Sequence, residues 1–174
     1  VAVRGESVPA ALLTSAFEEI LAERATPAAM AGLLVALRCK GETVEEIVAV
    51  ARVLRAHAIT APCPDPRTLD TCGTGGDGAD TFNISTVAAF VVAGAGVPVA
   101  KHGNRAASSK AGTADTLEAL GLDLARAGEL AAQTLPELGI AFFFAQAHHP
   151  ALGRIAPIRK ALGRRTIFNL LGPL

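Results

Sequence analysis

The sequence has 174 residues, of which 51% are hydrophobic, 18% charged and 4% aromatic. A chain of this length and apolar content can bury a core, which excludes an intrinsically disordered protein. Sixteen basic and sixteen acidic residues give a net charge of zero, and Trp and Tyr are absent. This composition argues against nucleic acid as a partner, because nucleic-acid-binding proteins normally carry a basic excess and aromatic stacking surfaces.

The cysteines and the apolar runs indicate the compartment. Cys39, Cys63 and Cys72 have neither a CxxC pair nor metal-ligand spacing, so a disulfide framework is not expected. The longest uncharged run, residues 81–100, contains two glycines and a proline, and its apolar stretch is far shorter than the ~20 residues of a membrane-spanning helix. We therefore expect a cytoplasmic protein that does not use a membrane as a partner.

The first third of the sequence predicts a helical domain. Apolar side chains recur at helical spacing between Leu12 and Leu21. A second helix is expected from Pro27 to the residue before Gly41, because proline favours the first turn and glycine the C-terminal stop. Thr43 with Glu46 forms a capping box for a third helix.

A proline-rich linker follows these helices. Residues 61–66 contain three prolines, a density that forbids helix. The sequence therefore predicts a helical N-terminal domain over residues 1–65. The remaining residues, 66–174, are expected to form the first part of a catalytic α/β domain.

Short apolar segments alternate with helices and glycine-rich loops beyond the linker. In chain order we expect a strand at 69–72, a helix at 85–93, a strand at 97–100, helices at 113–120 and 127–138, a strand at 140–145, a helix at 150–162 kinked at Pro157, and a strand or loop at 166–171. This alternation predicts an α/β fold with a mostly parallel sheet flanked by helices.

A glycine loop at residues 73–78 matches GxGxxG formally. The dinucleotide-binding interpretation fails, because no helix opens at the end of the loop and no acid lies between Asp80 and Asp115 to hold a ribose. A P-loop is excluded as well, since no glycine is followed by Lys-Ser or Lys-Thr at the required offset. Two interpretations stay open, an ordinary turn and a close approach of the backbone to a ligand.

Two further segments suit a phosphorylated ligand. Residues 83–86 (Asn-Ile-Ser-Thr) precede an apolar helix, whose N-terminus favours anions and whose hydroxyls can ligate Mg²⁺. Residues 101–105 (Lys-His-Gly-Asn-Arg) follow a predicted strand, where open α/β sheets bind ligands. Ser108, Ser109 and Thr113 add a second hydroxyl-rich helix entry. A plain N-cap and a solvated loop are the structural alternatives.

Charge is unevenly distributed along the sequence. No acid follows Glu137, while five basic residues lie between 138 and 174. Such a segment needs an anionic ligand or acids from elsewhere. Because the sequence also stops directly after the apolar run 167–171, we expect it to be a fragment.

Together these motifs resemble the anthranilate phosphoribosyltransferases of tryptophan biosynthesis. The matching blocks are residues 70–78 (DTCGTGGDG), 82–86 (FNIST), 101–105 (KHGNR), 113–121 (TADTLEALG), 148–151 (HHPA) and 165–174 (RTIFNLLGPL). The resemblance implies a nucleoside phosphorylase/phosphoribosyltransferase-like fold. It also implies transfer of a phosphoribosyl group from 5-phosphoribosyl 1-pyrophosphate (PRPP) to anthranilate, with Mg²⁺ and release of pyrophosphate.

The resemblance also implies site residues. The PRPP-binding residues would be Gly73, Gly76, Asp77, Thr81, Asn83, Ile84, Ser85, Thr86, Lys101, His102, Gly103, Asn104, Arg105, Ala106, Ala107, Ser108, Ser109 and Thr113. Anthranilate would contact Gly73, Asn104 and Arg159, and Ser85 would ligate Mg²⁺. His102 is the candidate for accepting the amine proton, and an equal alternative is that it only positions the amine.

Other functions stay open at the level of sequence. A pyrimidine nucleoside phosphorylase resembles this family in fold and has a glycine-rich phosphate loop. A truncated, non-catalytic assembly module is the alternative from another class. The family is longer than this sequence and carries a further Asp-Glu pair that binds Mg²⁺, and we expect a homodimer formed through the helical domain. His148-His149 lacks a third ligand at zinc spacing, and nothing in the sequence marks Cys72 as a nucleophile.

Overall fold

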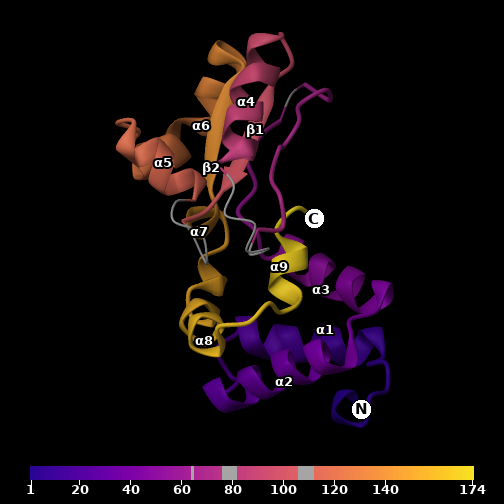
Figure 1. The fold of residues 1–174 in the computed structure, drawn as a ribbon. Coiled ribbons are helices and arrows are strands. Elements are labelled where there is room, and N and C mark those ends of the chain that lie inside the picture. Colours follow the sequence, from indigo (N-terminus) through magenta and orange to yellow (C-terminus); the bar gives the residue numbers. More distant parts are fainter. Residues whose placement is uncertain (64, 76–81, 106–111) are drawn as a thin grey trace. The chain divides into compact units, whose positions relative to one another are not determined.

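The computed structural model describes residues 1–63, 65–75, 82–105 and 112–174 (Figure 1). The chain forms two compact units. The helical unit combines residues 1–58 with residues 149–172, and the sheet unit comprises residues 59–148. A helix-rich chain with a parallel sheet confirms the predicted fold class.

The helical unit is built from segments at both ends of the sequence. Its elements are the 3₁₀ helix η1 (Ala2–Arg4), α1 (Ala10–Leu21), α2 (Pro27–Lys40), α3 (Val44–Ala56), the 3₁₀ helix η2 (Pro150–Leu152), α8 (Ile155–Leu162) and α9 (Ile167–Leu171). Phe17, Leu37 and Val50 are fully buried in its core, and Ile167 joins them from α9. The rings of Phe17 and Phe168 lie 5.8 Å apart, so α9 completes a core that the first three helices begin.

A buried carboxylate connects three segments of this unit. Glu46 accepts hydrogen bonds from the backbone N–H of Thr43 at 2.9 Å and of Val8 at 2.7 Å. The ammonium of Lys40 lies 2.7 Å from the same side chain, and both charged groups are buried. Thr43 also accepts from the backbone N–H of Glu46 at 3.3 Å, which confirms the predicted capping box. Glu46 thus caps α3 and ties it to α2 and to the N-terminal segment.

The sheet unit contains two parallel strands and four helices among its described residues. They are α4 (Ile84–Gly94), β1 (Val99–Gly103), α5 (Thr113–Ala119), α6 (Leu124–Leu138), β2 (Ile140–Phe144) and α7 (Ala145–His148). β1 and β2 pair in register from Val99 opposite Ile140 to Gly103 opposite Phe144. α5 and α6 form the crossover between them, with α6 packed along β2 and α4 along β1 (Figure 1).

The first strand differs from the prediction in its position. β1 covers Val99–Gly103 instead of 97–100, because Pro98 has no N–H and the ladder begins where the N–H of Val99 reaches the carbonyl of Gly139 at 2.9 Å. Lys101, His102 and Gly103 therefore lie in the strand and not in a loop after it. The strand expected at 69–72 is reduced to a single bridge between Leu69 and Val99.

The C-terminal segment differs more. The helix expected at 150–162 is broken into η2 and α8, and Pro157 causes no kink because it lies in the first turn of α8, where no N–H is needed. The expected strand or loop at 166–171 is the helix α9, whose start is capped by a 3.0 Å hydrogen bond from the N–H of Thr166 to Asn169. Residues 149–172 pack with the helical unit, while the domain division at 65/66 stays a prediction.

Among the helices of the described residues, none combines the length and the apolar content required to cross a lipid bilayer.

Candidate functional site

The start of the glycine loop is fixed to the end of β1 by one carboxylate. Oδ1 of Asp70 accepts hydrogen bonds from the backbone N–H of Cys72 at 2.9 Å and of His102 at 3.2 Å. The first closes an Asx turn, in which an aspartate side chain bonds to the backbone N–H two residues on, and the second crosses to the strand. Asp70 therefore sets the position of Cys72, directly before the glycines, relative to His102.

The N-terminus of α4 is capped as the sequence predicts. Oδ1 of Asn83 accepts from the N–H of Thr86 and from the hydroxyl of Ser85, each at 3.2 Å. The side-chain N–H of Asn83 points to the hydroxyl of Thr116 at 3.5 Å. The carbonyl of Ser85 accepts a 2.7 Å hydrogen bond from the hydroxyl of Thr71, which attaches the helix to the segment before the glycines.

The N-termini of α4 and α5 and the C-terminal end of β1 meet at this point. The hydroxyl of Thr86 donates to that of Thr113 at 3.2 Å, which joins the first turns of α4 and α5. Gly103, at the end of β1, approaches Thr113 so closely that an added Cβ would lie 2.8 Å from the Cβ of Thr113 and 2.9 Å from the ring of Phe142. Only glycine permits this contact. Packing therefore requires glycine at position 103, in addition to the PRPP-binding role that the resemblance implies.

Lys101 contributes a buried cation to the same strand. It is 3% exposed, shares the buried face of β1 with Val99 and Gly103, and donates from Nζ to the carbonyl of His102 at 2.6 Å. The same Nζ lies 4.0 Å from Oδ1 of Asp70. Burial lowers the pKa of Lys101, because removal from water disfavours the charged form. An anion bound nearby would stabilise that charge.

Arg105 is already engaged with acids of α5. Its guanidinium lies 3.0 Å from Asp115 and 2.7 Å from Glu118, and 6.0 Å from the ring centre of Phe144. The hydrogen bonds to Glu118 and then Asp115 raise the pKa of Arg105 further, so it stays charged. Asn104 bonds to the backbone N–H of Arg105 at 2.8 Å and faces Gln146 at 3.4 Å.

The predicted acceptor residue Arg159 belongs to the helical unit. Its guanidinium lies 5.4 Å from the ring centre of Phe168. In the parts of the chain that the structure describes, it makes no ion pair with an acid. Burial lowers its pKa. A half-buried guanidinium without a carboxylate partner suits a carboxylate ligand.

Several predicted site residues cannot be placed. Gly76, Asp77, Thr81, Ala106, Ala107, Ser108 and Ser109 lie outside the described residues. Gly73 is described, and an added Cβ there would meet open space. Among the described ones, Asn83, Ser85, Thr86, Gly103 and Thr113 are brought together, with the exposed Ile84 in the first turn of α4.

Sequence reasoning missed three residues of this region: Asp70, Thr71 and Thr116. All three make hydrogen bonds that hold the site together. Asp70 carried a usable signal, since an aspartate two residues before a backbone donor favours this kind of turn. The bonds of Thr71 and Thr116 join residues far apart in the sequence and leave no local pattern.

The side-chain oxygens at the N-terminus of α4 are chemically suited to bind Mg²⁺. The hydroxyl of Ser85 and the amide oxygen of Asn83 are hard oxygen ligands 3.2 Å apart, and both are neutral. Mg²⁺ is usually held by one or two carboxylates together with substrate phosphates. Negatively charged oxygens would therefore have to come from a phosphorylated ligand or from other acids.

Two family models together cover nearly all of the sequence. Residues 2–58 match the model of the glycosyl transferase family described as its helical bundle domain, and residues 65–174 match its a/b domain. The chain belongs to this glycosyl transferase family. The meeting of α4, α5 and β1 therefore lies within the a/b domain of the family.

Similar relatives and solved structures show which enzymes of the glycosyl transferase family this chain resembles. An anthranilate phosphoribosyltransferase of Novosphingobium aromaticivorans is 60% identical over 160 residues, which is 92% of this chain and 48% of the relative. The crystal structure of the enzyme of that name from Thermus thermophilus matches with a TM-score of 0.91 and 48% identity, over 99% of this chain and 52% of that one.

A yeast structure adds ligands to this comparison. Anthranilate phosphoribosyltransferase from Saccharomyces cerevisiae, in complex with PRPP and Mg, matches with a TM-score of 0.81 and 33% identity, over 95% of this chain and 50% of that one. The chain thus spans about half the length of the relatives and structures that it matches.

Proposed function

We propose that this chain forms the first half of an anthranilate phosphoribosyltransferase. The reaction transfers the phosphoribosyl group of PRPP to the amine of anthranilate and gives N-(5-phosphoribosyl)anthranilate and pyrophosphate. The observation that carries the proposal is the meeting of the first turns of α4 and α5 with the end of β1, held by the bond between Thr86 and Thr113 and by the close contact of Gly103.

The meeting point has the chemistry that a pyrophosphate leaving group needs. As the bond from ribose C1 to pyrophosphate breaks, the sugar gains oxocarbenium character and the leaving group gathers negative charge. The N-terminus of α4 offers backbone dipoles and the hydroxyls of Ser85 and Thr86, and Lys101 offers a buried positive charge. Bound Mg²⁺ would neutralise part of the developing charge, with Ser85 as one ligand.

The acceptor is proposed to bind through its carboxylate. Arg159 supports this role because, within the described residues, its guanidinium meets an aromatic ring and no acid. A planar guanidinium matches a carboxylate with two parallel hydrogen bonds. Asn104 and Gly73 would complete the anthranilate contacts. His102 either accepts the amine proton or positions the amine, and the aryl amine's weak nucleophilicity makes orientation important in both cases.

The test is an activity assay on a chimera. Residues 1–174 would be joined to the part of the Novosphingobium relative that lies beyond the matched region, with the intact relative as positive control. We expect a loss of anthranilate fluorescence that requires PRPP and Mg²⁺ and is matched by pyrophosphate release. An inactive but folded chimera beside an active relative would refute the proposal. A parallel assay supplies thymidine and phosphate in place of anthranilate and PRPP. Phosphorolysis of thymidine would favour a nucleoside phosphorylase instead.

Three further expectations belong to the same proposal. They are a homodimer formed through the helical domain predicted over residues 1–65, a cytoplasmic location and the absence of nucleic-acid and membrane partners. Light scattering behind size exclusion tests the first, because the 17.7 kDa chain would elute with twice its mass. A monomer at every concentration would contradict the predicted dimer without affecting the proposed reaction.

A further inference from the structure

Three side chains of different ligand chemistry meet beside the end of β1. One ligand atom from each of Asp70, Cys72 and His102 lies within 4.8 Å of the other two. Asp70 and His102 are 32 residues apart in the sequence, so the cluster exists only because the strand brings them together. The spacing of the cysteines alone gave no sign of a metal site.

The backbone of this cluster is held by Asp70 itself. Its Oδ1 accepts the backbone N–H of both Cys72 and His102, which fixes where the two side chains start. Within the described parts of the chain, Oδ2 of Asp70 accepts no hydrogen bond. One carboxylate oxygen therefore organises the ligands, while the other remains for a cation.

We infer that Asp70, Cys72 and His102 bind a thiophilic divalent cation of the Zn²⁺ class, at a position separate from the Mg²⁺ proposed at Ser85. The ligand atoms around tetrahedral zinc lie about 3.5 Å from one another, so side-chain rotation from a spacing of up to 4.8 Å is sufficient. Sulfur and imidazole ligands select Zn²⁺ or Co²⁺ over Mg²⁺. On binding, the thiol of Cys72 releases its proton to solvent and the thiolate becomes the ligand.

Charge and access are both compatible with such a cation. One carboxylate and one thiolate balance the two positive charges, and water can take the fourth position as in open zinc sites. Asp70 and His102 also line a hollow of about 300 Å³ that leads to them from solvent. The ammonium of Lys101, 4.0 Å from Oδ1 of Asp70, opposes binding and makes the site weaker than one with four protein ligands.

The first test uses the unsubstituted chain in the presence of excess Mg²⁺. Metal-free protein is alkylated with iodoacetamide, with and without Zn²⁺, and each cysteine is followed by mass spectrometry. A metal-bound thiolate is a poor nucleophile, so saturating Zn²⁺ should slow alkylation of Cys72 by about tenfold or more. Cys39, an exposed thiol in the helical unit, is the internal control and should react at an unchanged rate. The inference would be overturned if Zn²⁺ slowed the alkylation of Cys72 and Cys39 equally, or if it did not slow the alkylation of Cys72.

The second test compares two matched variants. Cys72→Ser should abolish the thiolate-to-metal absorption band of added Co²⁺, and Cys39→Ser should retain it. The affinity for Zn²⁺, measured against a chromophoric chelator, should fall in Cys72→Ser by more than the roughly 10- to 100-fold typical for loss of a supporting residue. Unchanged affinity in a folded Cys72→Ser chain would overturn the inference, and the alkylation result stands without any variant.

Discussion

The hydroxyl groups of Thr86 and Thr113 share a hydrogen bond of 3.2 Å across 27 residues of sequence. Thr86 lies in the first turn of α4 and Thr113 is the first residue of α5, and both side chains are buried. The two helix starts are therefore coupled directly, in addition to their common contact with the sheet. A ligand bound at the first turn of α4 would therefore contact a helix start that α5 helps to hold in position.

This coupling can be measured with a double-mutant cycle. Thr86→Val and Thr113→Val each remove a hydroxyl while keeping the side chain branched. Each should lower the free energy of unfolding by about 1 kcal/mol, since a buried partner is left unsatisfied. The double variant should lose less than the sum, with a coupling energy of about 0.5–1.5 kcal/mol in urea unfolding. Strict additivity would show that the hydrogen bond contributes nothing to stability.

Gly103 should tolerate no side chain. In Gly103→Ala the added Cβ would lie 2.8 Å from the Cβ of Thr113 and 2.9 Å from the ring of Phe142. Overpacking of this kind costs about 1–3 kcal/mol, which the urea midpoint would report. Gly128→Ala in α6 is the matched control, because its nearest neighbour would be the Cβ of Ala147 at 3.9 Å. It should stabilise the chain by about 0.5–1 kcal/mol through helix propensity, so opposite signs are expected for the same substitution.

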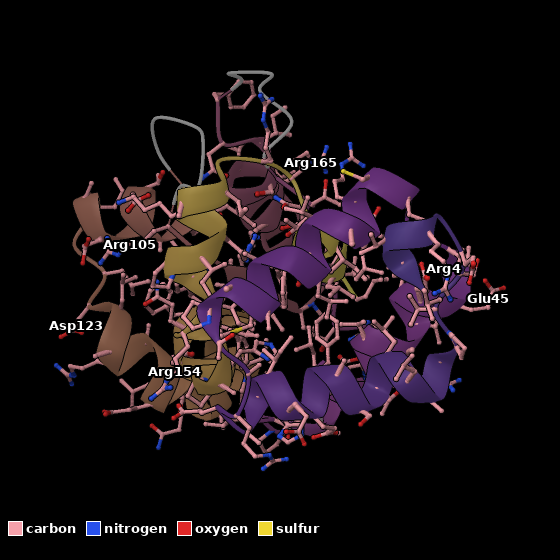
Figure 2. The ribbon with its side chains drawn as sticks, turned by 90° about the horizontal axis from the view of Figure 1, so that it is seen from below. Arg4, Glu45, Arg105, Asp123, Arg154 and Arg165 are labelled. Carbon is pink, nitrogen blue, oxygen red and sulfur yellow. The ribbon has the colours of Figure 1, made fainter. Side chains whose placement is uncertain are left out.

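The buried carboxylate of Glu46 should be essential to the helical unit. Glu46→Ala leaves the buried ammonium of Lys40 without its partner and should cost about 3–5 kcal/mol of unfolding free energy. Glu45→Ala is the neighbouring control, since Glu45 is exposed and points away from the helices (Figure 2). Its loss should cost less than about 1 kcal/mol, from the helix dipole alone. Similar costs for the two variants would contradict the connecting role of Glu46.

The same carboxylate should make stability depend on pH. Burial alone would raise the pKa of Glu46, but hydrogen bonds from Lys40, Thr43 and Val8 outweigh it and leave the pKa below the ordinary value. A lowered folded-state pKa means that the stabilisation is present above the unfolded pKa of about 4.3 and is lost as pH falls through the folded value. Unfolding free energies between pH 7 and pH 3 should therefore fall more steeply for the unsubstituted chain than for Glu46→Gln.

Arg159 should affect one substrate and not the other. In the chimera, Arg159→Met should raise KM for anthranilate by about 10- to 100-fold, as expected for loss of a charge-assisted hydrogen bond of about 1.5–3 kcal/mol. KM for PRPP should stay unchanged. The exposed neighbour Lys160 supplies the control, because Lys160→Met removes a charge from the same helix without touching the proposed carboxylate. Equal effects on both substrates would remove Arg159 from the acceptor site.

Local signals made most of the helical unit predictable. α2 covers Pro27–Lys40 and stops at Gly41, whose φ of 86° lies in the region that favours glycine. Both bounds were expected from proline and glycine alone. The capping box of Thr43 and Glu46 was equally readable, because its two hydrogen bonds join residues three positions apart.

Features decided by packing could not be predicted. The apolar run Ile167–Leu171 is typical of a strand, yet it forms α9 because it buries its side chains in the core begun by α1 to α3. The charge of Lys101 indicated a loop, whereas burial on the inner face of β1 keeps it within a strand. A local pattern cannot report a neighbour that arrives from a distant part of the chain.

The site shows the same division. Asn83 was expected as the N-cap of a helix, and its bonds to Thr86 and Ser85 are local. The engagement of Arg105 with Asp115 and Glu118 was not expected, since it depends on where α5 lies relative to the end of β1. The role of Arg105 at a phosphate accordingly stays a prediction, one that requires these ion pairs to exchange for a ligand.

The helical unit is interrupted by the whole sheet unit, and this sets an order of events during synthesis. Residues 1–58 leave the ribosome before the sheet unit, but their core lacks Ile155, Ile167, Phe168 and Leu171 until about one hundred further residues have followed. Because a chain emerges at about 5–20 residues per second, the first three helices wait for several seconds with an unfinished apolar surface. The sheet unit is continuous in sequence and can begin to fold during that interval, so the helical unit, whose first helices are made earlier, is expected to be completed only after residues 59–148 have been made.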